Sequence, residues 1–195
     1  MPNWYSTAMV VADSKVDPDC KFRFSVDECK KIISMVADKM TPLQVNTSGG
    51  AVQNDFIRKT EGCKLEMNDD TMWVYDKLMN SCEAMKEGRW PLTIDGFQPI
   101  QILKYEVGGK YDMHIDLGPG FASHRKISCT VQLSDESEYE GGELSFVANA
   151  KWNHASKEIG SMTIFPSYIL HKIEPVKSGT RYAMVVWFVG DEPMK

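Results

Sequence analysis

Residues 181–188 read Arg-Tyr-Ala-Met-Val-Val-Trp-Phe, a run in which every residue after the arginine is apolar or aromatic. Such a run predicts a buried β-strand. A guanidinium at the end of this strand would be costly to bury without an anion, and a carboxylate that accepts two N–H groups is its natural partner. Arg181 is therefore a candidate anchor for a dicarboxylate. Two plainer alternatives stay open, because Arg181 could pair with an acidic side chain of the protein or extend into water.

Short strand-like runs extend upstream of this stretch, and from Ile100 onward they are separated by Gly, Asp, Ser and Pro. Helical periodicity largely disappears there, so the C-terminal half is predicted to be mostly strands. The candidate strands are residues 98–106, 111–115, 126–133, 143–146, 161–165, 171–173 and 181–188. So many short strands at this spacing predict a sandwich or jelly roll.

The N-terminal half contains two helix signals. Ser25-Val26-Asp27-Glu28 is a capping box, and the helical spacing that follows it continues to Met40, before Thr41-Pro42. A second apolar stripe predicts a helix from about residue 68 to just before Gly88. Residues 46–50 are expected to form a mobile loop and residues 55–59 a short strand. The expected fold class is mainly β with supporting N-terminal helices.

Length, charge and cysteine content limit the classes of protein to which the chain can belong. The 195 residues fit a single domain, and 22 Lys and Arg against 27 Asp and Glu give a net charge of −5 without a long basic run, so nucleic acid is not an expected partner. No signal sequence or stretch long enough to span a membrane is visible, so we expect no membrane partner and a cytoplasmic location. The five cysteines are widely spread without a Cys-x-x-Cys pair, which indicates reduced thiols. The oligomeric state stays open.

His114-Ile115-Asp116 is a candidate for metal binding. Residues two apart on a strand point to the same side, so His114 and Asp116 can reach one ion while Ile115 faces away. With His171 downstream they supply two imidazoles and one carboxylate, the set that occupies one face of a non-haem Fe(II) centre and leaves three positions open. The alternatives are a solvated strand end for the triplet and a hydrogen-bonded structural role for His171.

Four further polar or glycine features could belong either to this site or to the scaffold around it. Tyr105 could donate its hydroxyl hydrogen to the carboxylate held by Arg181, or could be a buried structural tyrosine. His124 and His154 are expected to be exposed, because each lies in a polar or glycine-rich segment. Gly141-Gly142 is expected to form a tight connection between two strands.

Three motifs in order carry a family resemblance. The chain has His114-Ile115-Asp116, then Glu140-Gly141-Gly142-Glu143-Leu144, and then a segment from His171 to Arg181. This ensemble resembles the prolyl 4-hydroxylase superfamily of 2-oxoglutarate and Fe(II) dependent dioxygenases, and most of all its PKHD-type hydroxylase branch. The similarity covers residues 97–189; the N-terminal half resembles the branch through its helices and Ile57-Arg58.

The resemblance implies a fold, cofactors and roles for particular residues. It implies a double-stranded β-helix, or jelly roll, as the catalytic core over residues 97–190 of one domain, with residues 1–96 as a helical support region. It implies His114, Asp116 and His171 as iron ligands and as the catalytic centre. Arg181, Tyr105 and Trp187 would contact 2-oxoglutarate, although Trp187 is equally interpretable as a core residue. The cofactors would be Fe(II), 2-oxoglutarate and dioxygen, with ascorbate as a candidate reductant.

The implied activity is hydroxylation of a C–H bond, with peptidyl proline in a peptide or protein as the preferred substrate. Residues 47–51 and 118–123 are candidate substrate walls or lids. The chain differs from the family pattern at two positions that affect the implied roles. Leu144 stands where some prolyl hydroxylases have Thr, and Arg181 stands where many have Lys. The alternatives are a hydroxylase of a free amino acid or other small molecule, a non-catalytic β-helix binding module, and a zinc hydrolase built on the same three ligands.

Overall fold

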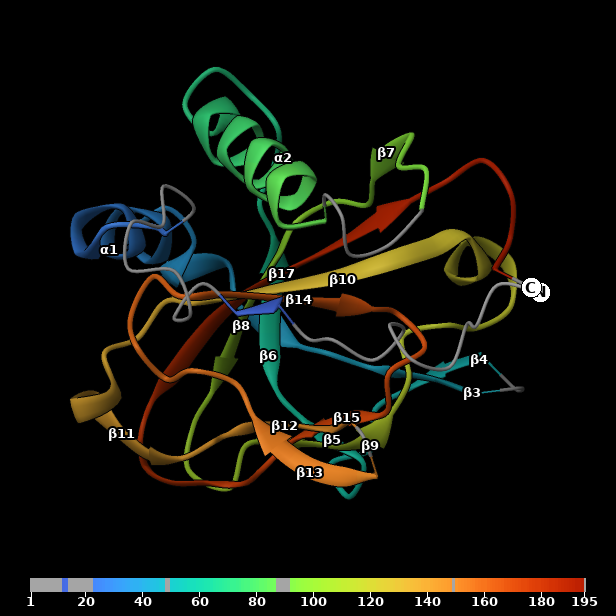
Figure 1. The fold of residues 1–195 in the computed structure, drawn as a ribbon. Coiled ribbons are helices and arrows are strands. Elements are labelled where there is room, and N and C mark those ends of the chain that lie inside the picture. Colours follow the sequence, from blue (N-terminus) through green and yellow to red (C-terminus); the bar gives the residue numbers. More distant parts are fainter. Residues whose placement is uncertain (1–11, 14–22, 48–49, 87–91, 149, 195) are drawn as a thin grey trace.

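The computed structural model describes residues 12–13, 23–47, 50–86, 92–148 and 150–194, and it consists mainly of antiparallel β-sheets (Figure 1). The helices within these ranges are α1 (Val26–Ser34) and α2 (Met72–Lys86), and the 3₁₀ turns are η2 (Ala37–Lys39), η3 (Gly120–His124) and η4 (Glu136–Glu138). The prediction of a mainly β chain with supporting N-terminal helices is confirmed. Neither α-helix is long and apolar enough to cross a bilayer.

The larger sheet has eight strands. Its order is β1 (Ala12–Asp13), β14 (Met162–Pro166), β10 (Arg125–Gln132), β17 (Arg181–Val189), β8 (Gln101–Tyr105), β6 (Glu61–Lys64) and β2 (Thr41–Pro42), and β7 (Gly96–Phe97) also pairs with β17. The strand predicted over 181–188 is thus central in this sheet, because β10 and β8 pair with its two edges.

The smaller sheet has five strands and lies across from the larger one (Figure 1). Its order is β13 (Lys151–His154), β12 (Leu144–Ala148), β15 (His171–Ile173), β9 (Lys110–His114) and β5 (Arg58–Lys59). Two further pairs are β11 (Tyr139–Gly141) with β16 (Val176–Gly179), and β3 (Val45–Thr47) with β4 (Gly50–Val52). The N-terminal half therefore contributes strands to both main sheets in addition to its helices.

The period-two alternation of the central strands separates two cores. Residues of one parity face the helices, among them Ile102, Cys129, Val186 and Phe188, and they pack in one cluster with Ile32 and Leu78. Residues of the other parity face the smaller sheet, where Leu103 and Tyr105 pack with Phe146, Phe165 and Ile173. Figure 1 shows α1 and α2 on the side of the larger sheet opposite the smaller sheet. The space between the two sheets is therefore separate from the helix-packing core.

The predicted capping box begins α1. The Ser25 hydroxyl accepts from the Glu28 backbone N–H, and the Glu28 carboxylate accepts from the Ser25 N–H. Glu28 also pairs with Lys77 of α2, with 2.6 Å between Oε2 and Nζ. The helix ends at Ser34, earlier than the predicted residue 40, because residues 37–39 continue as the 3₁₀ turn η2. The second helix was predicted within a few residues of its observed bounds.

Several strands differ from the sequence-based prediction. The predicted loop over 46–50 includes the ends of β3 and β4, and residues 48–49 lie outside the described part. The strand predicted over 55–59 is reduced to β5, since a turn precedes it. Strands β1, β2, β6, β7, β11, β13 and β16 were not predicted. Strand β13 is fully exposed and β16 mostly so, and neither carries a strong apolar alternation.

Candidate metal centre

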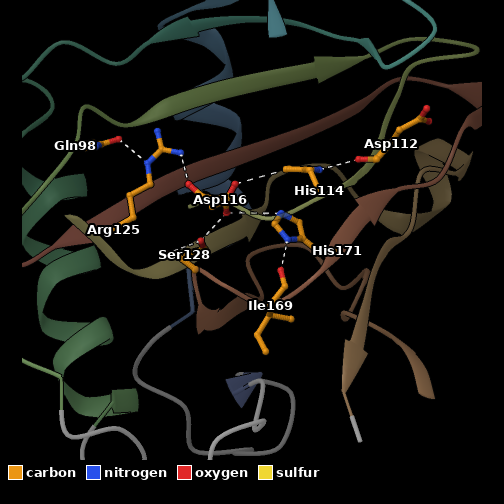
Figure 2. A network of polar contacts seen from close by, with 9 residues as sticks. Gln98, Asp112, His114, Asp116, Arg125, Ser128, Ile169 and His171 are labelled. Carbon is orange, nitrogen blue, oxygen red and sulfur yellow. Dashed lines mark hydrogen bonds and ion pairs between the residues drawn. The ribbon is translucent and has the colours of Figure 1, made fainter. Parts of the chain in front are cut away.

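Pairing between β9 and β15 brings the three predicted metal ligands together. His171 lies directly opposite His114 in the antiparallel register, although the two are distant in sequence. Asp116 follows β9 by two residues, and its backbone N–H donates to the carbonyl of Ser167 at 3.0 Å. Figure 2 shows the three side chains converging between the sheets. The ligand atoms of His114, Asp116 and His171 all lie within 4.8 Å of one another.

Both imidazoles are held in the orientation that a metal ligand needs. The Nδ1 of His114 lies 2.7 Å from the carbonyl oxygen of Asp112, and the Nδ1 of His171 lies 2.8 Å from that of Ile169. A carbonyl oxygen accepts hydrogen bonds, so each Nδ1 carries the hydrogen, and in the neutral form of the ring the lone pair is on Nε2. The Nε2 atoms point to the carboxylate of Asp116, at 3.7 Å from Oδ1 for His114 and 3.6 Å from Oδ2 for His171.

The protonation states also suit a cation. Burial, and to a smaller extent the neighbouring His171, lower the pKa of His114 to about 4, so His114 is neutral near neutral pH. Burial alone would raise the pKa of Asp116, but the nearby imidazoles of His171 and His114 and the Ser128 hydroxyl hold it below its ordinary value. The site thus presents an ionised carboxylate beside a neutral imidazole, which are the forms that bind a divalent metal.

Arg181 is buried without a compensating anion. Its residue is 4 % exposed, and one guanidinium nitrogen, Nη1, is buried with no hydrogen-bond partner among the described residues. Tyr105 lies opposite Arg181 in the β8–β17 register, with its ring centre 5.4 Å from the guanidinium carbon. Neither of the plainer alternatives holds, because Arg181 is not in water and forms no ion pair within the described part of the chain. A buried guanidinium in this state is costly unless a ligand supplies the anion.

One cavity connects these groups. It has a volume of about 650 Å³ and lies between the two sheets. Among the residues lining it are those predicted as ligands or cofactor contacts: His114, Asp116, His171, Arg181, Tyr105 and Trp187. Trp187 is 9 % exposed, so it is buried as a core tryptophan would be and also lines the cavity. The structure therefore brings the predicted site residues to one cavity.

Four further residues of the site were missed by sequence reasoning. Arg125 donates to the backbone carbonyl of Asp116 at 3.0 Å, and its guanidinium lies 3.8 Å from the centre of the Trp187 ring. Tyr111 stacks on His114 with 3.7 Å between ring centres, and Arg58 lies over Tyr111. Ser128 donates to the Asp116 carboxylate. The strand alternation of β10 could have placed Ser128 inside the sandwich, but Arg58 and Tyr111 depend on the pairing of β5 with β9.

The other two histidines lie away from the metal ligands. His154 is exposed, as predicted, and its Nδ1 lies 3.0 Å from the Ser145 hydroxyl. The prediction that His124 is exposed is wrong, because it is half-buried with its Nδ1 3.1 Å from the carbonyl of Gly190. The turn η3 buries this ring against the segment that follows β17.

The glycine pair and the candidate walls have clear positions. Gly141 and Gly142 have φ angles of +78° and +64° between β11 and β12, as expected for a tight connection. Of the candidate walls, Gly50 and Ala51 line the cavity on one side and Gly118, Pro119 and Ala122 on another. Both segments therefore line the same cavity as the metal ligands.

Comparisons with known proteins agree with this arrangement. Residues 100–189 match the model of the 2OG-Fe(II) oxygenase superfamily. The chain is 36 % identical over 110 residues to a PKHD-type hydroxylase of Stenotrophomonas maltophilia, covering 51 % of this chain and 48 % of that protein. It is 40 % identical over 92 residues to one of a Synechococcus species, covering 45 % of this chain and 40 % of that protein. The chain thus spans about half the length, or less, of these curated relatives.

Solved structures resemble the chain over nearly its whole length. A prolyl-4-hydroxylase of Pseudomonas putida superposes with a TM-score of 0.73 at 15 % identity, covering 93 % of this chain and 94 % of that one. A prolyl hydroxylase of Trichoplax adhaerens, in complex with a hypoxia inducible factor peptide fragment, gives 0.71 at 15 % identity, with 95 % and 85 % covered. At these identities the likeness concerns the fold, and the predicted double-stranded β-helix is confirmed. The predicted resemblance to the superfamily and its PKHD-type branch is confirmed by the sequence matches.

Proposed function

We propose, from the confirmed resemblance to the 2OG-Fe(II) oxygenase superfamily, that this chain is a 2-oxoglutarate- and Fe(II)-dependent dioxygenase that hydroxylates a C–H bond, with peptidyl proline as the preferred substrate. The single observation that carries the proposal is the cavity shared by the His114–Asp116–His171 cluster and the buried Arg181 guanidinium, whose Nη1 has no hydrogen-bond partner among the described residues. A metal site alone would fit many activities. A metal site beside a buried cation without its anion fits a dicarboxylate that chelates the metal and is anchored at its far end.

His114, Asp116 and His171 would hold the iron. Two neutral imidazoles and one carboxylate are the donor set that Fe(II) oxygenases use. Bound ferrous iron and 2-oxoglutarate supply the activation of dioxygen, coupled to decarboxylation of the co-substrate to succinate. The hydrogen bonds from the two Nδ1 atoms to backbone carbonyls fix both rings, so the protein orients the ligands before the metal arrives.

Arg181 would bind the distal carboxylate of 2-oxoglutarate. A planar guanidinium matches a carboxylate with two parallel N–H bonds, and burial strengthens that interaction. Tyr105 lies beside the guanidinium and could donate its hydroxyl hydrogen to the same carboxylate. Trp187 lies on the same face of β17 and lines the cavity together with Asp116, where it would contact the co-substrate.

Substrate would enter where the two candidate walls border the cavity. The peptide-bound Trichoplax hydroxylase and the prolyl-4-hydroxylase of Pseudomonas putida support a peptidyl proline substrate for this fold. Hydroxylation of a free amino acid is the main rival, since the 650 Å³ cavity could also hold a small molecule in full.

The decisive experiment reconstitutes the apoprotein anaerobically with Fe(II), 2-oxoglutarate and ascorbate, and then admits dioxygen with a peptide library or with free amino acids. Mass spectrometry would follow a product heavier by one oxygen, and succinate would be measured in parallel. We expect oxygen incorporation that requires both dioxygen and 2-oxoglutarate. The His171→Ala variant should lose it, whereas His154→Ala, a matched change at an exposed histidine outside the cavity, should keep it.

The possible results of this experiment distinguish the alternative functions. Turnover of a free amino acid without turnover of peptides would overturn the peptidyl part of the proposal. Iron binding without succinate or product from any substrate would overturn the dioxygenase assignment and favour a non-catalytic binding module. Activity with Zn²⁺ that is independent of 2-oxoglutarate would instead indicate a hydrolase.

A further inference from the structure

We propose that Ser128, supported by Ser167, is a positioning residue that fixes the rotation of the Asp116 carboxylate, so that the carboxylate faces the two imidazoles before a metal binds. This inference rests on the metal centre of the proposed function. It assigns a task to two buried hydroxyls that touch neither the co-substrate anchor nor the imidazoles.

Ser128 is placed inside the sandwich by its strand. It lies on β10 with 1 % of its surface exposed, and its cross-strand partners are Phe165 and Trp187. A hydroxyl among such large aromatic neighbours is costly to bury unless it forms a hydrogen bond. The Ser128 Oγ lies 2.5 Å from Oδ2 of Asp116 and 3.1 Å from the Oγ of Ser167, which is fully buried (Figure 2).

Counting hydrogens gives the direction of these bonds. An ionised carboxylate can only accept, so Ser128 must donate its single hydrogen to Asp116. The Ser128 oxygen then has lone pairs to accept from Ser167, whose hydroxyl supplies the hydrogen for the 3.1 Å contact. The two hydroxyls form a directed chain that ends on the carboxylate, and each bond in such a chain polarises the next.

The backbone of Asp116 is held separately. Its N–H donates to the Ser167 carbonyl at 3.0 Å, and its own carbonyl accepts from Arg125 Nη1 at 3.0 Å. With the backbone fixed, the two side-chain torsions of Asp116 are the freedom that is left, and the last of them, which rotates the carboxylate, is intrinsically broad. Ser128 restricts this rotation, because one carboxylate oxygen must stay on its hydroxyl.

The consequence is a carboxylate that faces both imidazoles in one fixed rotation. Oδ2 accepts from Ser128 and lies 3.6 Å from Nε2 of His171, whereas Oδ1 lies 3.7 Å from Nε2 of His114. A ligand that is aimed before the ion binds loses less rotational entropy on binding, and hydrogen bonds to a ligating carboxylate have this effect in other metal sites. Loss of the Ser128 hydroxyl should therefore weaken metal binding without any change in the ligands themselves.

The test uses the full chain as apoprotein and cobalt(II) alone as the probe. Cobalt affinity would be measured by titration against a chelator of known strength, and the visible absorption of the bound cobalt would report its coordination. We expect Ser128→Ala to lower the affinity on the order of 10-fold or more and to change the absorption spectrum. Ser128→Thr keeps the hydroxyl, and its added methyl can extend into the cavity that Ser128 lines, so it should restore both readouts.

Two further variants make the result decisive. Ser167→Ala should give a smaller loss than Ser128→Ala, because it removes the donor to Ser128 and leaves the bond to Asp116; it also carries the test if Ser128→Ala does not fold. Ser81→Ala removes an equally buried hydroxyl in α2, which bonds to the Lys77 carbonyl, and should leave cobalt binding unchanged.

The possible outcomes distinguish this inference from the proposed function. Wild-type affinity and spectrum in both Ser128→Ala and Ser167→Ala would overturn the positioning role and leave the metal centre intact. Weakened binding that Ser128→Thr does not restore would indicate a packing role and would also overturn it. The expected cobalt pattern in a protein without 2-oxoglutarate turnover would support the positioning role and refute the dioxygenase. A wild-type protein that binds no cobalt would overturn both.

Discussion

His114 and His171 face each other across the β9–β15 pair, and each ring is tied through Nδ1 to a backbone carbonyl two residues earlier in its own segment. The two rings lie 4.2 Å apart between their centres. The same local device thus orients both imidazoles, and the register of the two strands decides that their Nε2 atoms meet at Asp116.

Removal of the carboxylate charge should abolish tight metal binding. In Asp116→Asn the side chain keeps its size, but the neutral amide no longer compensates a divalent cation in a buried site. Mutation of a group that only hydrogen-bonds to a metal ligand lowers metal affinity by up to about 100-fold. Loss of the charge of a ligand itself should therefore lower the affinity by more than about 100-fold. Chelator competition with Fe(II) or cobalt(II) would measure it. Binding close to that of the wild type would show that Asp116 is not a ligand.

Replacement of the buried guanidinium should affect function and stability in opposite directions. Arg181→Met removes the partner of the distal carboxylate, and loss of a buried charge partner costs about 2–5 kcal/mol, so KM for 2-oxoglutarate should rise by at least about 30-fold. The apoprotein should become more stable by about 1 kcal/mol or more, because an unsatisfied buried donor is removed. Arg181→Lys keeps the charge and should give a smaller rise in KM. Kinetics and urea denaturation would check the two effects, and an unchanged KM for Arg181→Met would exclude the anchor role.

Gly160 should tolerate no side chain. Its φ is +76°, and a Cβ there would overlap the carbonyl oxygen of Phe24, whose N–H donates to the Gly160 carbonyl at 3.0 Å. Gly120 has a φ of +63° but open space around a Cβ, so Gly120→Ala isolates the backbone strain of about 1–2 kcal/mol. Gly160→Ala should lose more stability than this control in urea denaturation. Equal losses would mean that the Phe24 segment moves aside at no cost.

Thiol reactivity should follow burial. Burial raises the pKa of Cys29 to about 12 from its ordinary value of 9.0, so at pH 8 its reactive thiolate is about 1,000-fold scarcer than that of an unperturbed thiol. Cys63 is half-buried and should be alkylated faster in the native protein. Iodoacetamide labelling followed by peptide mass spectrometry would compare the two rates. The Cys29 thiol lies 3.9 Å from the carbonyl oxygen of Gln132 on β10, and labelling of Cys29 at the rate of Cys63 would indicate that this contact opens readily.

The sequence predicted the elements that carry strong local patterns. Strand β15 was predicted with its observed bounds, and β10 and β17 within a residue at each end. For β17 the reason is its long apolar run, which has few uses other than a buried strand. The weak strands β13 and β16 were missed because pairing, rather than composition, makes them strands.

The site residues likewise fall into those with a local sequence signal and those placed by strand pairing. His114 and Asp116 could be predicted from a two-residue spacing, and Arg181 from its position before an apolar run. The partners of these residues could not, because Ser128, Arg125 and Tyr111 reach the site through strand register and packing. The pairing of His171 with His114 is likewise a tertiary fact, which the sequence suggested through family resemblance and not through its own periodicity.

The alternation of β17 has a practical consequence for redesign. One face of this strand packs in the core with the two helices through Met184, Val186 and Phe188. The other face lines the cavity through Ala183 and Val185. A library that varies Ala183 and Val185 would reshape the chamber and leave the scaffold residues between them untouched. Selectivity for new molecules and robustness of the fold can therefore be tuned on adjacent positions of a single strand.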